Sequence, residues 1–98
     1  MKLAAFVSDY RLSVDSLERL KPEKLGIILV QNGVYHASIK ENGSASPVLG
    51  YSADYYALQE DLETRGIDTS KIDGKVKVIN IGDVVDLIFN DYEKTAWL

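Results

Sequence analysis

An almost unbroken apolar run, Leu25 to Val30, lies near the centre of the chain. No alternate position in it is polar, which is typical of a strand buried on both faces. The run stops at Gln31-Asn32-Gly33, and an amphipathic stretch containing Val34, Tyr35 and Ala37 follows at once. This pattern predicts a buried strand that leads directly into a helix, the core of a βα unit.

Three other segments have strand patterns: Lys2 to Val7, Asp54 to Leu58, and Lys75 to Ile81. The last alternates lysine or asparagine with valine or isoleucine, so one of its faces is more polar. We therefore expect this strand at an edge of the sheet.

Helices are predicted between the strands. The first runs from about Val14 to Leu20, with a capping-box spacing over Asp15 to Glu18 and a stop at Pro22. A short helix over Gln59 to Arg65 ends where Gly66 can cap it. The last helix starts at Gly82-Asp83 and carries a broad apolar face, made of Val84, Val85, Leu87, Ile88 and Phe89.

The remaining segments read as connections. Lys40 to Gly50 is rich in Gly, Ser and Pro and predicts an exposed loop or loose hairpin. Asp68 to Gly74 is a polar connection with room for one helical turn, and Tyr92 to Leu98 is a short tail. The order β-α-β-α-β-α-β-α predicts one α/β domain over residues 1–98, in three layers, with a mainly parallel four-stranded sheet.

The amino-acid composition excludes several kinds of reactive and metal-binding site. The 98 residues include no cysteine and one histidine, His36, which excludes thiol nucleophiles, thiolate metal sites and His-rich metal sites. The net charge of −4 argues against direct nucleic-acid binding. No stretch approaches the roughly 20 apolar residues of a membrane span. A cytoplasmic location is therefore expected.

Candidate reactive groups each have a structural alternative. In open α/β sheets ligands gather at strand ends, so any site is expected near Asn32 and Gly33, although Asn-Gly also serves as a tight turn. His36 could contact a partner there, but a lone histidine is more often a surface or hydrogen-bonded helix residue. Carboxylates at Glu60, Asp61 and Asp83 are interpreted as helix N-terminal acids.

Asp61 and Arg65 are four residues apart in the predicted helix over Gln59 to Arg65, so they can pair on its surface. We predict no catalytic, cofactor-binding or metal-binding residue.

Aromatic residues exceed the needs of a small core, and tyrosine and tryptophan are enriched at protein interfaces. Packing in the core and under the tail is the alternative interpretation. The residues predicted as interface candidates are Asn32, Gly33, Tyr35, His36, Tyr55, Tyr56 and Trp97.

Four sequence blocks, in order, carry a resemblance: GIILVQNGVYHA, YYALQEDLETRGID, VINIGDVVDLIF and the terminal TAWL. Together they resemble the DsrH/TusB family of sulfur-relay proteins. In that family a buried strand ends in a Gln/Glu-Asp/Asn-Gly-Val/Ile step, and the chain closes on Ala-Trp-Leu or similar. The blocks cover most of the chain from Leu25 onward, and the N-terminal part matches in layout only.

The resemblance implies a small DsrE/DsrH-like α/β domain that assembles with DsrE-like and DsrF-like subunits into a hexamer, DsrEFH or TusBCD. These complexes pass persulfide sulfur between proteins, for 2-thiolation of the wobble uridine in tRNA or for sulfur oxidation. Some members carry a cysteine in the first helix, where this chain has Leu17-Glu18-Arg19-Leu20. The resemblance is thus to the cysteine-less members, whose role is non-catalytic.

Two other functions remain open. The chain could be a self-associating α/β interaction domain of diverged role, forming a homo-oligomer. It could also be a small enzyme with carboxylates near Asn32, Glu60 and Asp83 at the strand ends, which no nucleophile, metal cluster or phosphate loop supports.

Overall fold

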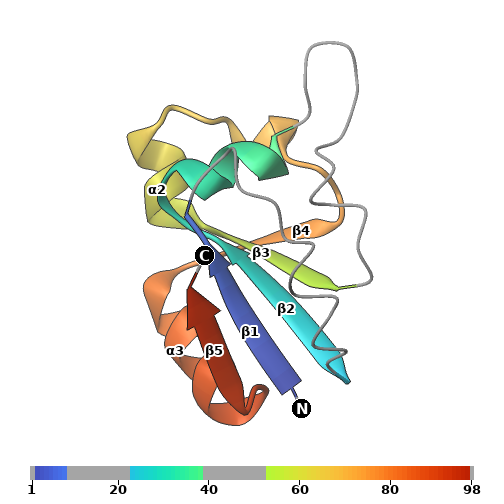
Figure 1. The fold of residues 1–98 in the computed structure, drawn as a ribbon. Coiled ribbons are helices and arrows are strands. Elements are labelled where there is room, and N and C mark those ends of the chain that lie inside the picture. The colour runs from blue at the N-terminus through green and yellow to red at the C-terminus, as the bar shows by residue number, and fades with distance from the viewer. Residues whose placement is uncertain (1, 9–22, 39–52, 98) are drawn as a thin grey trace.

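The computed structural model describes residues 2–8, 23–38 and 53–97, and within them five strands form one parallel sheet (Figure 1). The spatial order is β4-β3-β2-β1-β5. The strands are β1 (Lys2–Val7), β2 (Lys24–Leu29), β3 (Asp54–Leu58), β4 (Val76–Ile79) and β5 (Lys94–Trp97). The first predicted helix and the predicted loop over Lys40 to Gly50 lie outside the described residues.

The predicted α/β class and parallel sheet are confirmed, but the predicted number of four strands is wrong. The segment read as a tail forms β5, which pairs in parallel with β1 from Leu3↔Lys94 to Phe6↔Trp97. KTAW has no clear alternation of apolar and polar residues, and its strand conformation depends on the free edge of β1. The strand predicted over Lys75 to Ile81 does lie at a sheet edge, as β4, but it spans only Val76–Ile79, and Ile81 belongs to the following helix.

In the described part of the chain, two helices cover one face of the sheet and one covers the other. The 3-10 helix η1 (Gln31–Ala37) follows β2, and α2 (Gln59–Thr64) follows β3. A short 3-10 turn, η3 (Thr69–Lys71), comes before β4, and α3 (Ile81–Asn90) follows it. In Figure 1, η1 lies in front of the sheet and α3 lies behind it.

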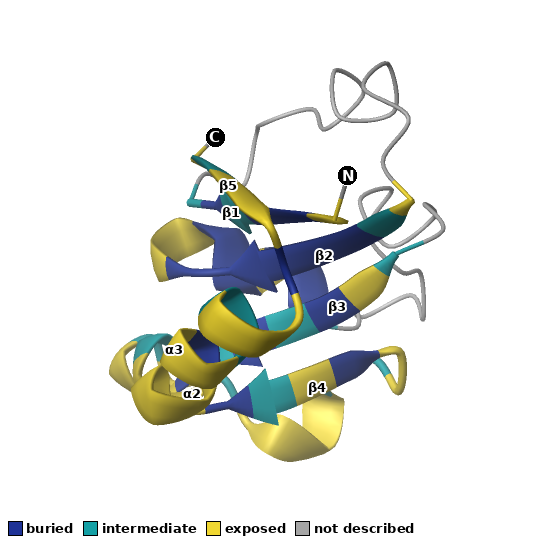
Figure 2. Ribbon diagram, turned by 90° about the horizontal axis from the view of Figure 1, so that it is seen from below, coloured by how far each residue is buried: buried dark blue, intermediate teal, exposed yellow. Residues whose placement is uncertain are grey.

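Alternate residues of the strands therefore point into two separate hydrophobic cores, one on each face of the sheet. Leu3, Ala5, Val7, Ile27 and Leu29 pack with Val34 of η1 and Leu62 of α2. Ala4, Ile28, Val30 and Ile79 pack with Val84 of α3 and with Tyr92. β2 contributes to both and is buried along nearly its whole length (Figure 2). This gives the three-layer arrangement.

η1 starts earlier than the predicted helix, because Gln31, Asn32 and Gly33 belong to it. A Cβ atom on Gly33 would clash with the backbone carbonyl oxygen of Val7, at the end of β1. Only glycine lets η1 approach the sheet this closely. The Asn-Gly step thus joins helix to sheet instead of forming a separate turn.

Local hydrogen bonds cap both described α-helices, α3 at its start and α2 at its end. At the start of α3, the Asp83 N–H donates to Asn80 Oδ1 (2.9 Å) and the Asn80 N–H donates to Asp83 Oδ2 (3.2 Å), a capping box. α2 ends in a Schellman motif, in which the Ile67 N–H donates to the Leu62 carbonyl (2.9 Å) and Gly66 has φ 67°. The predicted cap at Gly66 is therefore confirmed.

Tyr92, between α3 and β5, fills the space left by Gly26 of β2, where a Cβ would meet the Tyr92 ring. Its hydroxyl is buried without a hydrogen bond to any described residue. Burial raises the pKa of Tyr92, and the nearby Tyr56 hydroxyl adds to the rise, although the two hydroxyls lie outside hydrogen-bond geometry. Asp54 and Asp91 raise it further.

We expect Gly33→Ala to lower the free energy of unfolding by about 2–3 kcal/mol, because the new methyl group forces η1 away from β1. Urea denaturation of both proteins measures this difference. Gly74→Ala is the matched control, since its new methyl group would have no described atom within 4 Å beyond its own chain neighbours. Equal stability of the two variants would contradict the close approach.

Tyr92→Phe should raise the free energy of unfolding by about 1 kcal/mol, because it removes a buried hydroxyl without a partner among the described residues.

The raised pKa of Tyr92 also makes the stability depend on pH. Above the ordinary tyrosine pKa of about 10, the unfolded chain releases the hydroxyl proton and the folded chain retains it. The folded state then loses stability as the pH rises. Tyr92→Phe should reduce this alkaline loss, measured by urea denaturation from pH 8 to 11, and a destabilised variant would refute the assignment.

Candidate functional site

The strand-to-helix step after β2 lies at the carboxyl edge of the sheet, where parallel α/β proteins place their sites. Gln31 opens η1 with φ 49°, in the left-handed region that residues other than glycine seldom adopt. Its N–H donates to Oδ2 of Asp61 on α2 at 2.8 Å. This hydrogen bond holds the strained residue and joins the neighbouring helices η1 and α2.

Arg65 of α2's C-terminal end adds further bonds between α2 and η1. Its Nε donates to Asn32 Oδ1 at 3.1 Å, and its Nη1 lies 3.5 Å from Asp61 Oδ1. The predicted Asp61–Arg65 pair is therefore confirmed, and it also reaches η1. Asn32 and Asp61 use their oxygens to accept these bonds, so the arrangement serves to lock η1 against α2.

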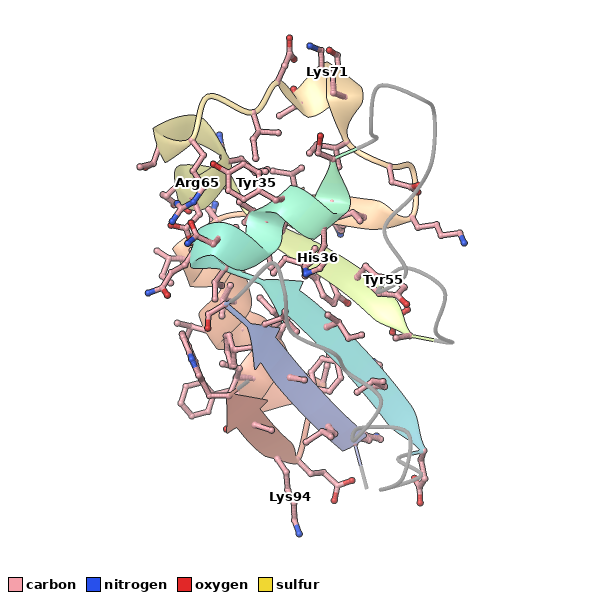
Figure 3. The ribbon with its side chains drawn as sticks, turned by 45° about the horizontal axis from the view of Figure 1, so that its top comes forward. Tyr35, His36, Tyr55, Arg65, Lys71 and Lys94 are labelled. Carbon is pink, nitrogen blue, oxygen red and sulfur yellow. The ribbon has the colours of Figure 1, made fainter. Side chains whose placement is uncertain are left out.

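The structure divides the seven predicted interface residues by exposure. Gly33, His36 and Tyr55 are buried, and Tyr56 is half-buried. Asn32, Tyr35 and Trp97 are exposed, with Tyr35 at 42% and Trp97 at 62%. Figure 3 shows His36 between η1 and the sheet, and Tyr35 on the other side of η1. The prediction of an interface role is therefore kept for the three exposed residues, Asn32, Tyr35 and Trp97.

These surface residues fall into two separate regions. Asn32 and Tyr35 lie on η1, on one face of the sheet. Trp97 lies on edge strand β5 beside Phe6, whose side chain packs with the opposite core. The ring centroids of Phe6 and Trp97 are 5.4 Å apart with an interplanar angle of 19°, so the two rings stack.

The groups proposed for an enzyme, near Asn32, Glu60 and Asp83, are not assembled into one site. Glu60 is exposed in the first turn of α2, and Asp83 belongs to the capping box of α3 on the opposite side of the sheet. The neighbouring Asp61 is bonded to η1. Among the described residues, no group of three or more His, Cys, Asp or Glu side chains is arranged to hold a metal ion. Asp83 has a structural role in helix capping, and Asp61 has one in the contact between η1 and α2.

The seven predicted interface residues leave out the most exposed apolar residues outside β5, although Val85 and Phe89 were predicted on the broad apolar face of the last helix. Ile81, Val85 and Phe89 of α3 are 60%, 46% and 81% exposed. The signal was present, because an apolar face as broad as that of this helix is wider than one side of a surface helix can bury.

Comparison with known proteins identifies the family. The family model described as "DsrH like protein" matches residues 7–94. The chain belongs to the DsrH-like protein family. The Protein TusB of Photorhabdus laumondii is 33% identical over 90 residues, which cover 92% of this DsrH-like chain and 93% of that protein. The Protein TusB of Yersinia pestis is 29% identical over 90 residues, with the same coverage.

Solved structures agree on the fold. The ychN protein from E. coli superposes with a TM-score of 0.68 at 11% identity, over the full length of both chains. A Methanobacterium thermoautotrophicum protein of unknown function also gives a TM-score of 0.68, at 14% identity, covering 96% of this DsrH-like chain and 97% of that protein. At such low identity these likenesses describe the fold alone.

The family assignment implies a subunit of a sulfur-relay or tRNA-thiolation system. In the part of the chain that the structure describes, the helices are all too short or too polar to cross a membrane.

Asp61→Ala should lower the free energy of unfolding by about 1 kcal/mol more than Glu60→Ala, because it leaves the Gln31 N–H without its acceptor. Both variants remove a carboxylate from the first turn of α2, so the effect on the helix dipole is matched. Chemical denaturation measures the difference. If the two variants were equally stable, the Gln31–Asp61 bond would contribute nothing to the fold.

Proposed function

We propose that this chain is a non-catalytic subunit of a cytoplasmic sulfur-relay complex resembling DsrEFH or TusBCD, and that it supports 2-thiolation of the wobble uridine in tRNA or sulfur oxidation. The observation that carries the proposal is the pairing of a DsrH-like match over residues 7–94 with a sequence that contains no cysteine. A persulfide requires a thiolate that both accepts and releases sulfur, and this chain has none.

The proposed mechanism is therefore indirect. DsrE-like and DsrF-like partner subunits would carry the sulfur on their cysteines, and this chain would shape the complex and position them. Locked helices suit such a role, because an interface element held by its own hydrogen bonds loses little further freedom on binding. The Asp61, Arg65 and Asn32 bonds hold η1 and α2 in this way.

A self-associating domain of diverged role is the second candidate. The exposed apolar residues of α3 and β5 favour it, because they could also bury one another in a homo-oligomer.

Mixing the chain with the DsrE-like and DsrF-like proteins of its own genome at micromolar concentration tests both candidates. We expect one co-eluting complex on size-exclusion chromatography with light scattering. When a sulfur donor supplies ³⁵S, the label should appear on the partners' cysteines and not on this chain. Leaving this chain out should reduce sulfur transfer.

Samples of each protein alone are the controls for elution position. A stable homo-oligomer that ignores both partners would replace the proposed function with the second candidate. Absence of any association would contradict both.

A further inference from the structure

Two hollows lie along edge strand β4. The larger, of about 530 Å³, lies between α3 and β4, and the other, of about 450 Å³, begins at Asp54 and Lys75. Tyr56 and Lys77 line both, so the hollows join into one trough, which we name the α3–β4 groove. Its α3 wall is polar and consists of Asp83, Asp86, Asn90 and Asp91.

The outer edge of β4 is open beside this groove. β4 pairs with β3 on its inner side, and no described strand pairs with it on the other. The backbone N–H and C=O groups on the open side can therefore bond to an added strand. In strand addition the main-chain bonds provide affinity, and alternate side chains of the added segment enter the adjoining pockets. The α3–β4 groove lies where such side chains would enter.

The charge of the groove is negative along α3. Asp83, Asp86 and Asp91 line this part, and Lys77 is the one cation among the described residues that do so. The carboxylates of Asp86 and Asp91 form no hydrogen bond or ion pair with another described residue. At the other end Asp54 and Lys75 balance each other in charge. An occupant that brings positive charge to α3 therefore complements the groove.

Asp91 lies where its charge is unfavourable to the free protein. It caps the C-terminal end of α3, which is the negative pole of the helix dipole, and the last turn of the helix contains no basic residue. A lysine or arginine side chain from an occupant would offset this repulsion. The interaction energy of Asp91 is thus gained on binding and not on folding.

The spacing of the acids favours an extended peptide over a metal ion. Asp83 and Asp91 are separated by about 12 Å along the helix axis, close to the length of about 13 Å that four strand residues such as those of β4 span. Among the described residues, no three or more acids or histidines are arranged to hold a metal ion. The negative charge is therefore spread along an added strand.

A second copy of the chain complements the groove less well. Symmetric pairing of two β4 strands would bring Lys77 of each copy to the same junction, and like charges on adjacent strands oppose pairing. The acidic walls of both α3 helices would also lie on the same side of the joined sheet. A partner with a basic segment avoids both repulsions.

We propose that the α3–β4 groove binds an extended segment of a partner protein, which adds to β4 as a further strand and places a lysine or arginine side chain beside Asp86 and Asp91. The inference rests on the proposed function, in which DsrE-like and DsrF-like subunits are the partners. The half-buried Tyr56 gives the floor of the groove an aromatic surface for the uncharged side chains of the segment.

The affinity of charge variants for the two partner subunits, measured by calorimetry at low salt, tests the role of the acids. We expect Asp86→Asn combined with Asp91→Asn to weaken binding about tenfold or more. Glu60→Gln combined with Glu63→Gln is the matched control, because it removes two carboxylates from α2 on the other face of the sheet. This control should change affinity by less than about twofold.

A stability measurement separates binding from a structural role. Asp91→Asn removes an unfavourable charge from the end of α3, so the urea midpoint of the free chain should rise while affinity for the partners falls. A variant that lowered both the midpoint and the affinity would show a structural role and overturn the assignment of Asp91.

Amide hydrogen exchange reports on strand addition directly. Exchange at the outward-facing amides of Val76–Ile79 should slow about tenfold or more when the partners are added, because those N–H groups gain acceptors. β5 is the other edge strand and serves as the internal comparison. Protection that appears at β5 and not at β4 would contradict the proposal.

The outcomes separate the two proposals. If the complex forms while exchange at β4 is unchanged and the two double variants bind equally, the groove proposal is overturned and the proposed function stands. If no complex forms, both fall. If the chain alone forms a dimer in which β4 is protected, the occupant is a second copy and our choice of partner is wrong.

Discussion

Burial of β2 on both faces is the constraint on which the rest of the structure depends. Its side chains alternate between the core under η1 and α2 and the core under α3, so neither face can be left open to water. Parallel pairing of the strands requires crossover connections, and η1, α2 and α3 lie in the connections that follow β2, β3 and β4. The later elements are placed by the need to complete those two layers.

At the carboxyl end of β2, close packing and hydrogen bonds hold η1 against the sheet and against α2. The absence of a side chain at Gly33 brings η1 against β1, and the left-handed Gln31 makes the sharp exit from the strand. Asp61 and Arg65 of α2 then hold this exit in place. The polar groups at this edge of the sheet therefore bond to one another.

The two sides of the sheet are finished differently. η1 and α2 are joined by hydrogen bonds and leave mostly polar side chains outside. On the other side, α3 packs on the sheet and leaves Ile81, Val85 and Phe89 exposed. A small domain that leaves aromatic rings on its surface in this way has a physical reason to bind a further protein.

Local patterns in the sequence determined a large part of this protein. The apolar run at β2, the strand segments at β1 and β3, the helix cap at Gly66 and the Asp61–Arg65 pair all depend on nearby residues, and each was predictable. The missing cysteine was equally plain from the sequence. Tertiary structure alone decided that Lys94–Trp97 is a strand, because its hydrogen-bond partner β1 lies about 90 residues away in the chain.

Tertiary structure alone also decided which of the predicted interface residues are exposed and which are buried. His36 and Tyr55 have side chains suited to a surface, and only the packing of η1 on the sheet buries them. Phe89 has a side chain suited to a core, and only the placement of α3 over one part of the sheet leaves it exposed. Helical and strand periodicity say which residues share a face, but the neighbour that covers that face is set by how the layers pack.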